Sequence, residues 1–168
     1  MARRSNEAPR TRQGGSAAAD ADPALDLQQY FPYRLARLAE QVSLAVAEVY
    51  ADRFALSRQE WRILAVLGTR PELPTKEIGR LTTLDKMNVS RAMQSLEARG
   101  IVRRTRDPED GRERIVALTD AGRALYRRIV PYAVEREASL LAVLTREEIA
   151  TLNTVMRKLS AAASTEKA

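Results

Sequence analysis

The sequence predicts a mainly α-helical fold with one β-hairpin between its fourth and fifth helices. Two observations support this order. Apolar residues recur every three or four positions along most of the chain, which is the spacing of one face of an α-helix. Between residues 101 and 118 the period shortens towards two, and the turn-forming sequence DPEDG lies in the middle of that stretch. The chain has 168 residues, 45% of them hydrophobic, so it can bury a core and its length fits one domain.

The N-terminal part of the sequence changes character near residue 24. Residues 1–24 are rich in Ala, Arg, Ser and Gly and show no periodicity, so we expect a flexible arm there. From Phe31 an apolar stripe predicts an amphipathic helix of about 20 residues that ends near Phe54. The stripe comprises Leu35, Leu38, Val42, Ala45 or Val46, and Val49.

Two capping boxes mark the starts of later helices. Ser57 and Glu60 have the spacing in which a hydroxyl and a carboxylate each bond a free backbone amide at a helix N-terminus. They open a second helix, RQEWRILAVLG, and Gly68 is placed to end it. Thr145 and Glu148 repeat the motif and open the last helix. The apolar face of that last helix comprises Ile149, Leu152, Val155 or Met156, and Leu159.

The third and fourth helices follow a short connector that holds Pro71 and Pro74. We expect Thr75 to cap the third helix, KEIGRLTTL. Asp85 should cap the fourth helix, DKMNVSRAMQSLEARG, and Gly100 lies just beyond its end. The predicted hairpin then begins directly after the fourth helix.

After the hairpin, Thr119 restarts a long helix that could extend to Leu144, and Pro131 inside it should produce a kink. The middle of the chain therefore has the layout of a winged helix-turn-helix, in which the second helix of the pair docks into the DNA major groove. The expected division is a flexible arm (1–24), an N-terminal flanking helix (25–56), a winged helix-turn-helix (57–118), two C-terminal flanking helices (119–160) and a frayed tail (161–168).

The composition excludes several classes of site. The chain has no cysteine and no histidine, so disulfides, thiolate or imidazole metal sites and catalytic triads that need either residue are impossible. We find no glycine-rich phosphate loop and no carboxylates at metal-binding spacing, so we expect no enzyme, no cofactor and no metal. No stretch is apolar enough to span a membrane, and the absence of cysteine fits a reducing cytoplasm, where we expect the protein. The net charge of +6 is spread along the chain and is weak evidence for a nucleic-acid partner by itself.

The two faces of the fourth helix differ in chemistry. Val89, Met93 and Leu96 cluster on one side of a helical wheel and should pack on the core. The opposite face offers amide, hydroxyl and guanidinium groups, which are groups that read base edges in DNA. It comprises Met87, Arg91, Gln94 and Ala98, flanked by Asn88, Ser90 and Ser95. An ordinary solvated face is the alternative, but such faces usually mix Glu with Lys, and here the one acid, Glu97, lies at the edge.

The turn of the hairpin is surrounded by Arg103, Arg104, Arg106, Arg112 and Arg114. If the fourth helix lies in a major groove, the turn reaches over the adjacent DNA backbone, and Arg112 at its tip can contact a phosphate or the minor groove. Asp110, two residues earlier, could pair with Arg112 and fix its direction. The alternative is an exposed turn whose ion pairs contribute well under ~1 kcal/mol.

Residues 81–126 resemble the core of the MarR (multiple antibiotic resistance regulator) family of bacterial transcription factors, and the likeness extends over roughly residues 30–160. The matching residues are Leu96, Glu97, Arg99, Gly100, Asp107, Asp110, Gly111, Arg112, Leu118, Thr119 and Gly122. The resemblance implies a homodimer that binds a near-palindromic operator in double-stranded DNA and represses transcription until a small ligand releases it. The implied fold class is mainly α, a winged helix-turn-helix with flanking dimerisation helices (α-α-α-α-β-hairpin-α-α).

The resemblance also assigns roles to single residues. The fourth helix would contact bases, and the wing arginine, Arg112, would enter the minor groove, braced by Asp110. The base-contacting residues carried over are Ser90 and Arg91, and further Lys86, Met87, Asn88 and Gln94. Family members that sense oxidants through cysteine or metals through histidine have no counterpart here, because the chain lacks both residues.

The implied ligand site lies between the dimerisation helices and the DNA-binding part. An aromatic ligand would stack on Trp61, and an arginine would hold its carboxylate. The candidate lining residues are Tyr30, Tyr33, Arg34, Arg37, Trp61 and Arg62. Their arginines favour an aromatic acid such as a hydroxycinnamate or a benzoate, free or as a thioester. The alternative is that Trp61 and Tyr33 serve only in core and hinge packing.

Several functional hypotheses stay open from the sequence. The first is a sequence-specific, ligand-responsive dimeric repressor. The second is an architectural protein that binds DNA without sequence preference, and the third is a winged-helix module that binds proteins and has lost DNA binding. The response of binding to DNA sequence and to salt separates these three hypotheses.

Overall fold

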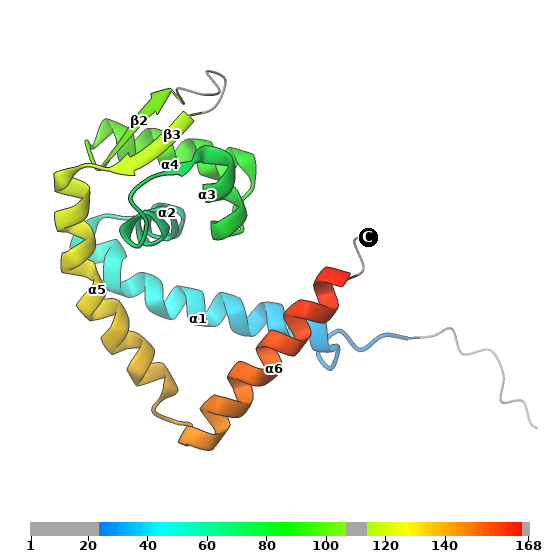
Figure 1. Ribbon diagram of the computed structural model, residues 1–168. Coiled ribbons are helices and arrows are strands. Elements are labelled where there is room, and N and C mark those ends of the chain that lie inside the picture. Colours follow the sequence, from blue (N-terminus) through cyan, green and yellow to red (C-terminus); the bar gives the residue numbers. More distant parts are fainter. Residues whose placement is uncertain (1–23, 107–113, 166–168) are drawn as a thin grey trace, which may run out of the picture. The chain divides into compact units, whose positions relative to one another are not determined.

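The computed structural model describes residues 24–106 and 114–165, and its elements are mostly helices. The chain divides between residues 36 and 37 into two units. The elements are α1 (Phe31–Phe54), α2 (Arg58–Gly68), β1 (Leu73–Pro74), α3 (Thr75–Thr82), α4 (Lys86–Ala98), β2 (Val102–Arg106), β3 (Arg114–Leu118), α5 (Asp120–Leu141) and α6 (Arg146–Thr165). Figure 1 shows α2, α3 and α4 gathered beside the sheet, and α5 leading from the sheet to α6. The predicted mainly α-helical class with a small antiparallel sheet is confirmed.

In the described part of the first unit, a turn precedes α1. The backbone amides of Gln29 and Tyr30 both donate to the carbonyl of Asp26, at 3.1 and 3.0 Å. The amides of Tyr33 and Arg34 then donate to the carbonyl of Tyr30, which continues the chain into the helix. The helix bounds agree with the prediction from Phe31 to near Phe54.

The sheet has three antiparallel strands, in the order β1-β3-β2, whereas the sequence predicted a two-stranded hairpin. The additional strand, β1, is only two residues long, so no alternation of side chains could reveal it. Its Pro74 has no backbone N–H to donate, which is tolerated because β1 lies at the edge of the sheet. The register pairs Leu73 with Val116 and Pro74 with Ile115, and on the other side runs from Val102 opposite Leu118 to Arg106 opposite Arg114.

The predicted caps are confirmed at three helices and wrong at one. Ser57 and Glu60 form both bonds of the capping box at α2, and Thr145 and Glu148 form both bonds of the second box before α6. The side chain of Asp85 caps α4. Thr75 does not cap α3, because it is the first residue of the helix and Pro74 holds the N-cap position. The hydroxyl of Thr75 donates to the carbonyl of Arg114 at 3.0 Å and so ties the start of α3 to β3.

Two glycines shape the ends of α2 and α4. Helix α2 ends at Gly68 as predicted, but the structural need is space, since a Cβ there would overlap the ring of Tyr126. Gly100 has a positive φ of 66°. Its amide donates to the carbonyl of Glu97 and the next amide, of Ile101, donates to that of Leu96, both at 2.9 Å. This pair of bonds is the Schellman motif that ends a helix at a left-handed residue.

The start of α5 is fastened to the connection between α4 and β2. The hydroxyl of Thr119 donates to the carbonyl of Gly100 at 2.6 Å, and its amide donates to that of Ile101 at 3.1 Å. One turn later Gly122 is buried, and a Cβ on it would overlap the carbonyl oxygen of Ile101. Helix α5 then continues through Pro131 and ends at Leu141, three residues before the predicted limit.

The buried core lies in and around the winged region. Its largest fully buried side chains are Ile63, Leu64, Leu67, Ile78, Met93, Leu96, Val116 and Ile129. The inward face predicted for the fourth helix is therefore confirmed. No helix among the described residues is long and apolar enough to cross a membrane.

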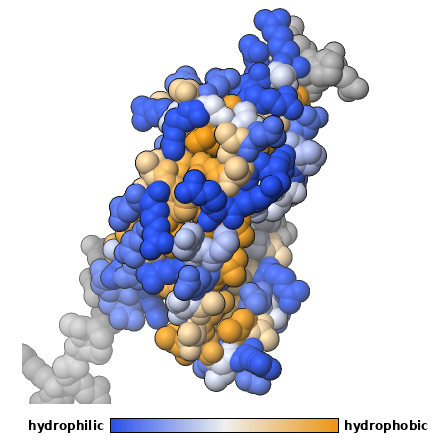
Figure 2. All heavy atoms as spheres, turned by 90° about the vertical axis from the view of Figure 1, so that its left-hand side faces the viewer, coloured by the Kyte–Doolittle hydropathy of each residue, from blue (hydrophilic) through white to orange (hydrophobic). Residues whose placement is uncertain are grey.

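The flanking helices contrast with this core. Among its described side chains, α6 has no buried residue. Large apolar side chains remain exposed on α1, α5 and α6, including Leu38, Val42, Val134, Leu152, Val155, Met156 and Leu159. Figure 2 shows patches of hydrophobic residues among hydrophilic ones on the face of the molecule where α5 lies.

Candidate nucleic-acid interface

Helix α4 is held firmly from beneath. Val89, Met93 and Leu96 are at most 4% exposed, and Ala92 beside them is also buried. An Asp85 cap at the start and the Gly100 turn at the end fix both termini. The outer face of the helix is thus presented by a rigid support.

The predicted contact residues lie mostly on that outer face. Lys86, Ser90, Arg91 and Gln94 are exposed, and Met87 is 63% exposed. They extend along α4 from its first turn to its third, on the side away from the core. The structure therefore brings together five of the six predicted residues of this helix as one accessible face.

Asn88 is the sixth, and its surroundings differ. It is half-buried, and its side-chain nitrogen donates to Asp85 Oδ2 at 2.6 Å while its backbone amide donates to Oδ1 at 2.8 Å. These two bonds, the backbone bond first, lower the pKa of Asp85 below its ordinary value. The amide nitrogen of Asn88 is thus already engaged in the first turn of the helix.

The acid at the edge of α4 is neutralised locally. Glu97 accepts two hydrogen bonds from the guanidinium of Arg104 on β2, and these bonds hold the pKa of the Glu97 carboxyl below its ordinary range. A paired carboxylate repels an approaching phosphate far less than a free one does. The presence of Glu97 is therefore compatible with the binding of an anion on the outer face of α4.

A groove of about 550 Å³ runs beside α4, between α3 and β2. Lys76 and Arg80 of α3, Lys86 of α4 and Arg104 of β2 line it, above the buried side chain of Met93. Arg80 is paired with Glu77 in the same helix, at 2.6 Å. Since Arg104 is likewise paired with Glu97, the remaining positive charge of this groove comes from Lys76 of α3 and Lys86 of α4, which spacing along one helix could not reveal.

The wing residues Asp110 and Arg112 lie outside the described residues. The strands that lead to them, β2 and β3, carry Arg103, Arg104, Arg106 and Arg114 and no acid. Arg103, Arg106 and Arg114 are exposed. The base of the predicted wing is thus basic.

The predicted ligand residues Trp61 and Arg62 share a second groove, of about 380 Å³, with the last part of α1. Trp61 is half-buried and stacks on Tyr50, with ring centroids 5.5 Å apart, and more distantly on Tyr126 of α5, at 6.5 Å. Burial raises the pKa of the Tyr50 hydroxyl, against the opposing charges of Arg58 and Arg62. Sequence reasoning missed Tyr50, although it follows directly after the apolar stripe of α1.

The other predicted ligand residues lie outside this groove or in the first unit. Tyr30 is 44% exposed and Arg34 is exposed, while Tyr33 is half-buried, all in the first unit. Arg37 is exposed in the second unit and is not among the residues that line the groove. Within the described residues no cluster of three or more acids could hold a metal ion.

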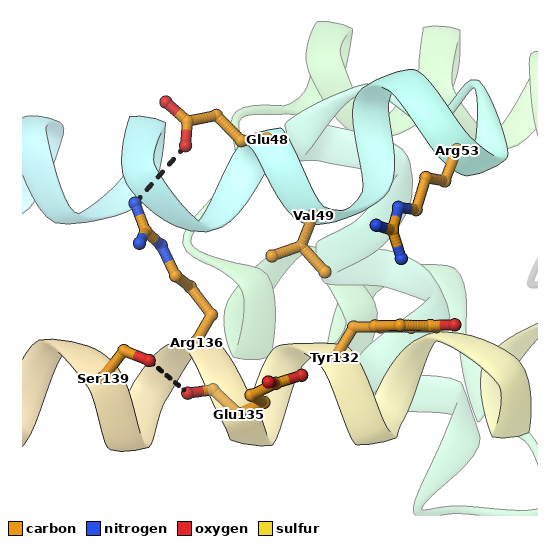
Figure 3. Close-up of a pocket in the computed structure, with 7 residues that line it drawn as sticks. All are labelled: Glu48, Val49, Arg53, Tyr132, Glu135, Arg136 and Ser139. Carbon is orange, nitrogen blue, oxygen red and sulfur yellow. Dashed lines mark hydrogen bonds and ion pairs between the residues drawn. The ribbon is translucent and has the colours of Figure 1, made fainter.

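A further pocket, of about 270 Å³, lies between α1 and α5 (Figure 3). Arg53 lies over the ring of Tyr132, 4.9 Å from its centroid. Arg136 donates to the carbonyl of Ala45 at 3.0 Å and pairs with Glu48 at 3.3 Å. These contacts join α5 to α1, so the polar residues that line this pocket serve to hold the two helices together.

Comparison with known proteins agrees with this geometry. Residues 56–113 match the model of the MarR family. The HTH-type transcriptional regulator YwoH of Bacillus subtilis is 32% identical over 97 residues, which cover 58% of this chain and 70% of the relative. The structure of the PcaV transcriptional regulator from Streptomyces coelicolor in complex with its natural ligand superposes with a TM-score of 0.70, at 27% identity, over 84% of this chain and 99% of that one. The transcriptional repressor CouR bound to a 23-mer DNA duplex superposes with a TM-score of 0.68, at 26% identity, over 80% of this chain and 95% of that one.

Proposed function

The chain belongs to the MarR family of transcriptional regulators, and on this basis we propose that it is a dimeric repressor released from a near-palindromic operator by a small anionic aromatic ligand. The observation that carries the DNA-binding part is the outer face of α4, which is accessible, rich in hydrogen-bonding groups and backed by a buried apolar face. Such a helix can enter a major groove without disturbing the core behind it.

We assign the base contacts to Ser90, Arg91 and Gln94, because hydroxyl, guanidinium and amide groups read base edges. Lys86 and Met87 stand at the start of the helix, where Lys86 would meet a phosphate. Asn88 remains a candidate, but its contact would have to use the carbonyl oxygen of its side chain or break the bond to Asp85.

In the wing, we propose that Arg112 enters the minor groove and that Asp110 directs it. The support is the positive charge at the start of the wing, since β2 and β3 carry arginines and no acid. DNA that reaches this edge of the sheet would meet positive charge from both β2 and β3.

The dimer would form through α1, α5 and α6. The support is the exposed apolar surface of these helices, since Leu152, Val155 and Met156 on α6 are each at least 39% exposed. A two-fold dimer buries the same patch on both copies and sets the two α4 helices at a fixed separation.

We place the effector in the groove lined by Tyr50, Trp61 and Arg62. An aromatic ring would stack on the half-buried face of Trp61, and a carboxylate would pair with the exposed guanidinium of Arg62. The solved relative with its natural ligand supports a ligand-responsive regulator, but the ligand class proposed here follows from this groove. Arg37, which lies on α1 outside the groove, stays a candidate, and Tyr30, Tyr33 and Arg34 of the first unit remain predictions from the sequence.

The test is selection of binding sites from a random DNA pool, followed by affinity measurements on the selected operator. The selected sites should be near-palindromic. Arg91→Ala and Ser90→Ala should change the preferred bases, whereas Lys86→Ala should weaken binding to all sequences and flatten the salt slope by about one unit. Arg127→Ala, which removes an exposed arginine of α5, is the control for loss of charge.

Other outcomes would identify another function. Binding without any preferred sequence would indicate an architectural DNA-binding protein, and no binding to DNA would indicate a winged-helix module for protein partners. A panel of benzoates and hydroxycinnamates that neither raises the melting temperature nor releases DNA would refute the anionic aromatic effector alone.

A further inference from the structure

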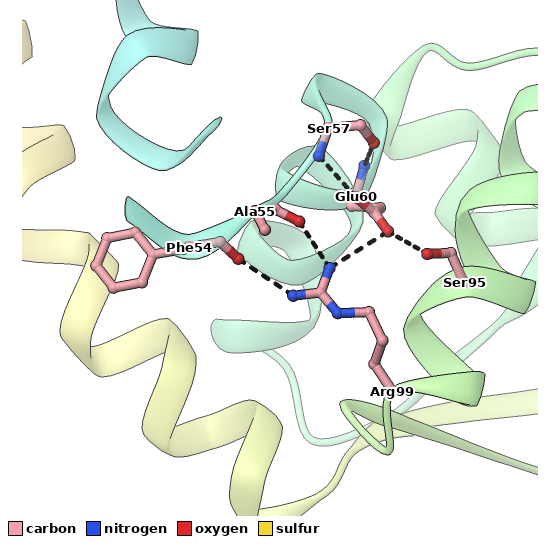
Figure 4. A network of polar contacts seen from close by, with 6 residues as sticks. All are labelled: Phe54, Ala55, Ser57, Glu60, Ser95 and Arg99. Carbon is pink, nitrogen blue, oxygen red and sulfur yellow. Dashed lines mark hydrogen bonds and ion pairs between the residues drawn. The ribbon is translucent and has the colours of Figure 1, made fainter. Parts of the chain in front are cut away.

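A polar network around a buried carboxylate joins α2, α4 and the end of α1 beside the proposed DNA-binding face (Figure 4). Glu60, in the first turn of α2, is only 6% exposed. One of its oxygens accepts from the backbone amide of Ser57 at 2.6 Å, and the other accepts from the hydroxyl of Ser95, on α4, also at 2.6 Å. Glu60 therefore does more than cap α2, because it also holds the side of α4 that faces α2.

Arg99 extends this network from the end of α4 to the end of α1. Its guanidinium donates to the carbonyls of Ala55 at 2.8 Å and Phe54 at 3.1 Å, and lies 3.7 Å from Glu60. Ala55 has a positive φ of 50°, so the chain turns sharply where these carbonyls are exposed to Arg99. The planar fork of arginine can meet two carbonyls at once, which the single ammonium of lysine does less well.

Together, Glu60 and Arg99 set the angle between α4 and α1. Glu60 fixes α4 to α2 through Ser95, and Arg99 fixes the end of α4 to the end of α1. Each bond involves a charged group, which makes a hydrogen bond stronger than a neutral pair does, and the bond from Ser95 to Glu60 is also partly buried. Since α1 belongs to the proposed dimer interface, a change of this angle in both copies would change the separation and rotation of the two α4 helices.

We infer that Glu60 and Arg99 are positioning residues that set the orientation of α4 relative to α1 and thereby the half-site spacing that the dimer accepts. The inference rests on the proposed function, because it needs a dimer and an operator with two half-sites. Neither side chain contacts the DNA in this assignment. They act through the placement of Ser90 and Arg91 on the exposed surface of α4.

The experiment measures spacing discrimination, using the operator selected by the wild-type protein and the same operator with one base pair inserted at its centre. One base pair turns the second half-site by about 35° around the DNA axis, so a rigid dimer cannot meet both half-sites. We expect the wild type to bind the inserted operator more weakly by about tenfold or more. Arg99→Lys, which keeps the charge, should reduce this ratio by about tenfold or abolish it, the effect of one lost charge-assisted hydrogen bond. Ser95→Ala should lower the ratio in the same direction.

The matched control is Arg58→Lys. Arg58 pairs with Glu40 at 2.7 Å, so it also joins α2 to α1 through an arginine and an acid, but it does not touch α4. This variant should keep the wild-type ratio. Urea unfolding of each variant verifies that it is folded at the temperature of the binding assay, and Ser95→Ala decides the question if Arg99→Lys does not fold.

The outcomes separate the inference from the function on which it rests. If the wild type binds both operators equally, the proposed dimeric operator recognition is wrong. If the wild type discriminates and Arg99→Lys and Ser95→Ala discriminate equally well, the positioning role is wrong. An equal loss in Arg58→Lys would also overturn it, because general loosening of α1 against α2 would then explain the result.

Discussion

Helices α4 and α6 each carry an apolar stripe on one face, but the two faces lie in different surroundings. In α4 these residues, Val89, Ala92, Met93 and Leu96, are at most 6% exposed. In α6 the corresponding set, Leu152, Val155, Met156 and Leu159, is between 39% and 50% exposed. The same pattern of residues therefore predicts an amphipathic helix in both places, but only α4 finds its packing partner within the described chain.

This difference indicates how the two regions obtain their stability. The winged region packs around a core that Tyr50 of α1 and Ile129 of α5 complete within the same chain, so it should keep its structure whatever the state of assembly. The exposed face of α6 leaves apolar area in water, and each Å² that a second copy covers contributes about 25 cal/mol. We therefore expect the flanking helices to depend on assembly and the winged region to depend on internal packing.

Leu152→Asp on α6 should disrupt the proposed dimer. In a two-fold dimer each interface would receive two carboxylates without partners, and burying an unpaired charge costs several kcal/mol. The dissociation constant should rise by about 1,000-fold or more. Sedimentation equilibrium measures it, with Ala150→Asp as the control because Ala150 lies on the opposite face of α6. A dimer of wild-type strength in Leu152→Asp would show that α6 does not form the interface.

Gly122→Ala should destabilise the junction between α5 and the winged region. The added Cβ would overlap the carbonyl oxygen of Ile101, which is backbone and cannot move aside without shifting β2. We expect the free energy of unfolding to fall by about 3 kcal/mol. Gly79→Ala is the control, because the nearest atoms lie 3.7 Å from its new Cβ and alanine favours the helix by about 1 kcal/mol. Urea denaturation monitored by circular dichroism compares the two, and equal stabilities would contradict the close approach at Gly122.

Arg112→Ala in the wing should separate binding from folding. Loss of a minor-groove arginine should weaken operator affinity by about 1–3 kcal/mol. Asp110→Ala should weaken this affinity less, because Arg112 stays present and loses only the side chain that orients it. Fluorescence anisotropy with labelled operator measures both. The melting temperature should stay unchanged, and unchanged affinity in Arg112→Ala would remove the role proposed for the wing.

The smallest effect concerns the response of stability to acid. Burial alone would raise the pKa of Glu60, but the hydrogen bonds of Ser95 and Ser57 and the charge of Arg99 outweigh it and hold this pKa below its ordinary value of 4.5. A carboxyl group with a lowered folded-state pKa contributes stability that is complete above the ordinary pKa and is lost as the pH falls through the folded value.

Glu60→Gln should therefore flatten the acid limb of the curve of unfolding free energy against pH. The difference between wild type and variant should be constant above the ordinary pKa and shrink below it. Glu137→Gln, at an exposed acid of α5, serves as the control and should retain the wild-type limb. An acid limb in Glu60→Gln as steep as that of the wild type would show that Glu60 gains no stability from its partners.

What the sequence could predict depended on the range of the contact. The caps at Ser57, Asp85 and Thr145 involve residues three positions apart, and the two faces of α4 follow from one helical period, so both were predictable. The bond from Thr75 to Arg114 joins residues 39 positions apart, and the one from Ser95 to Glu60 joins residues 35 apart. Local spacing carries no information about such pairs, which is why the bond that ties α3 to β3 and the network around Glu60 were missed.

In the candidate sites too, local features could be predicted and long-range contacts could not. The outer residues of α4 could be recognised because they interrupt an apolar period within one helix. The aromatic partners of Trp61 could not, because Tyr50 reaches it from α1 and Tyr126 stacks on the indole from α5. Only the folded chain brings these three rings together.

The stack at Trp61 gives the molecule an optical property. Trp61 is the single tryptophan of the chain, and its indole lies 5.5 Å from the ring of Tyr50 and 6.5 Å from that of Tyr126. At such separations light absorbed by either tyrosine passes to the indole, so excitation of the tyrosines is read out as tryptophan emission. The emission of Trp61 therefore responds to a rearrangement of α1 or α5 against α2 without any added dye. A shift of either helix would change the wavelength and the intensity of the Trp61 emission, which can be followed in the native sequence and in real time.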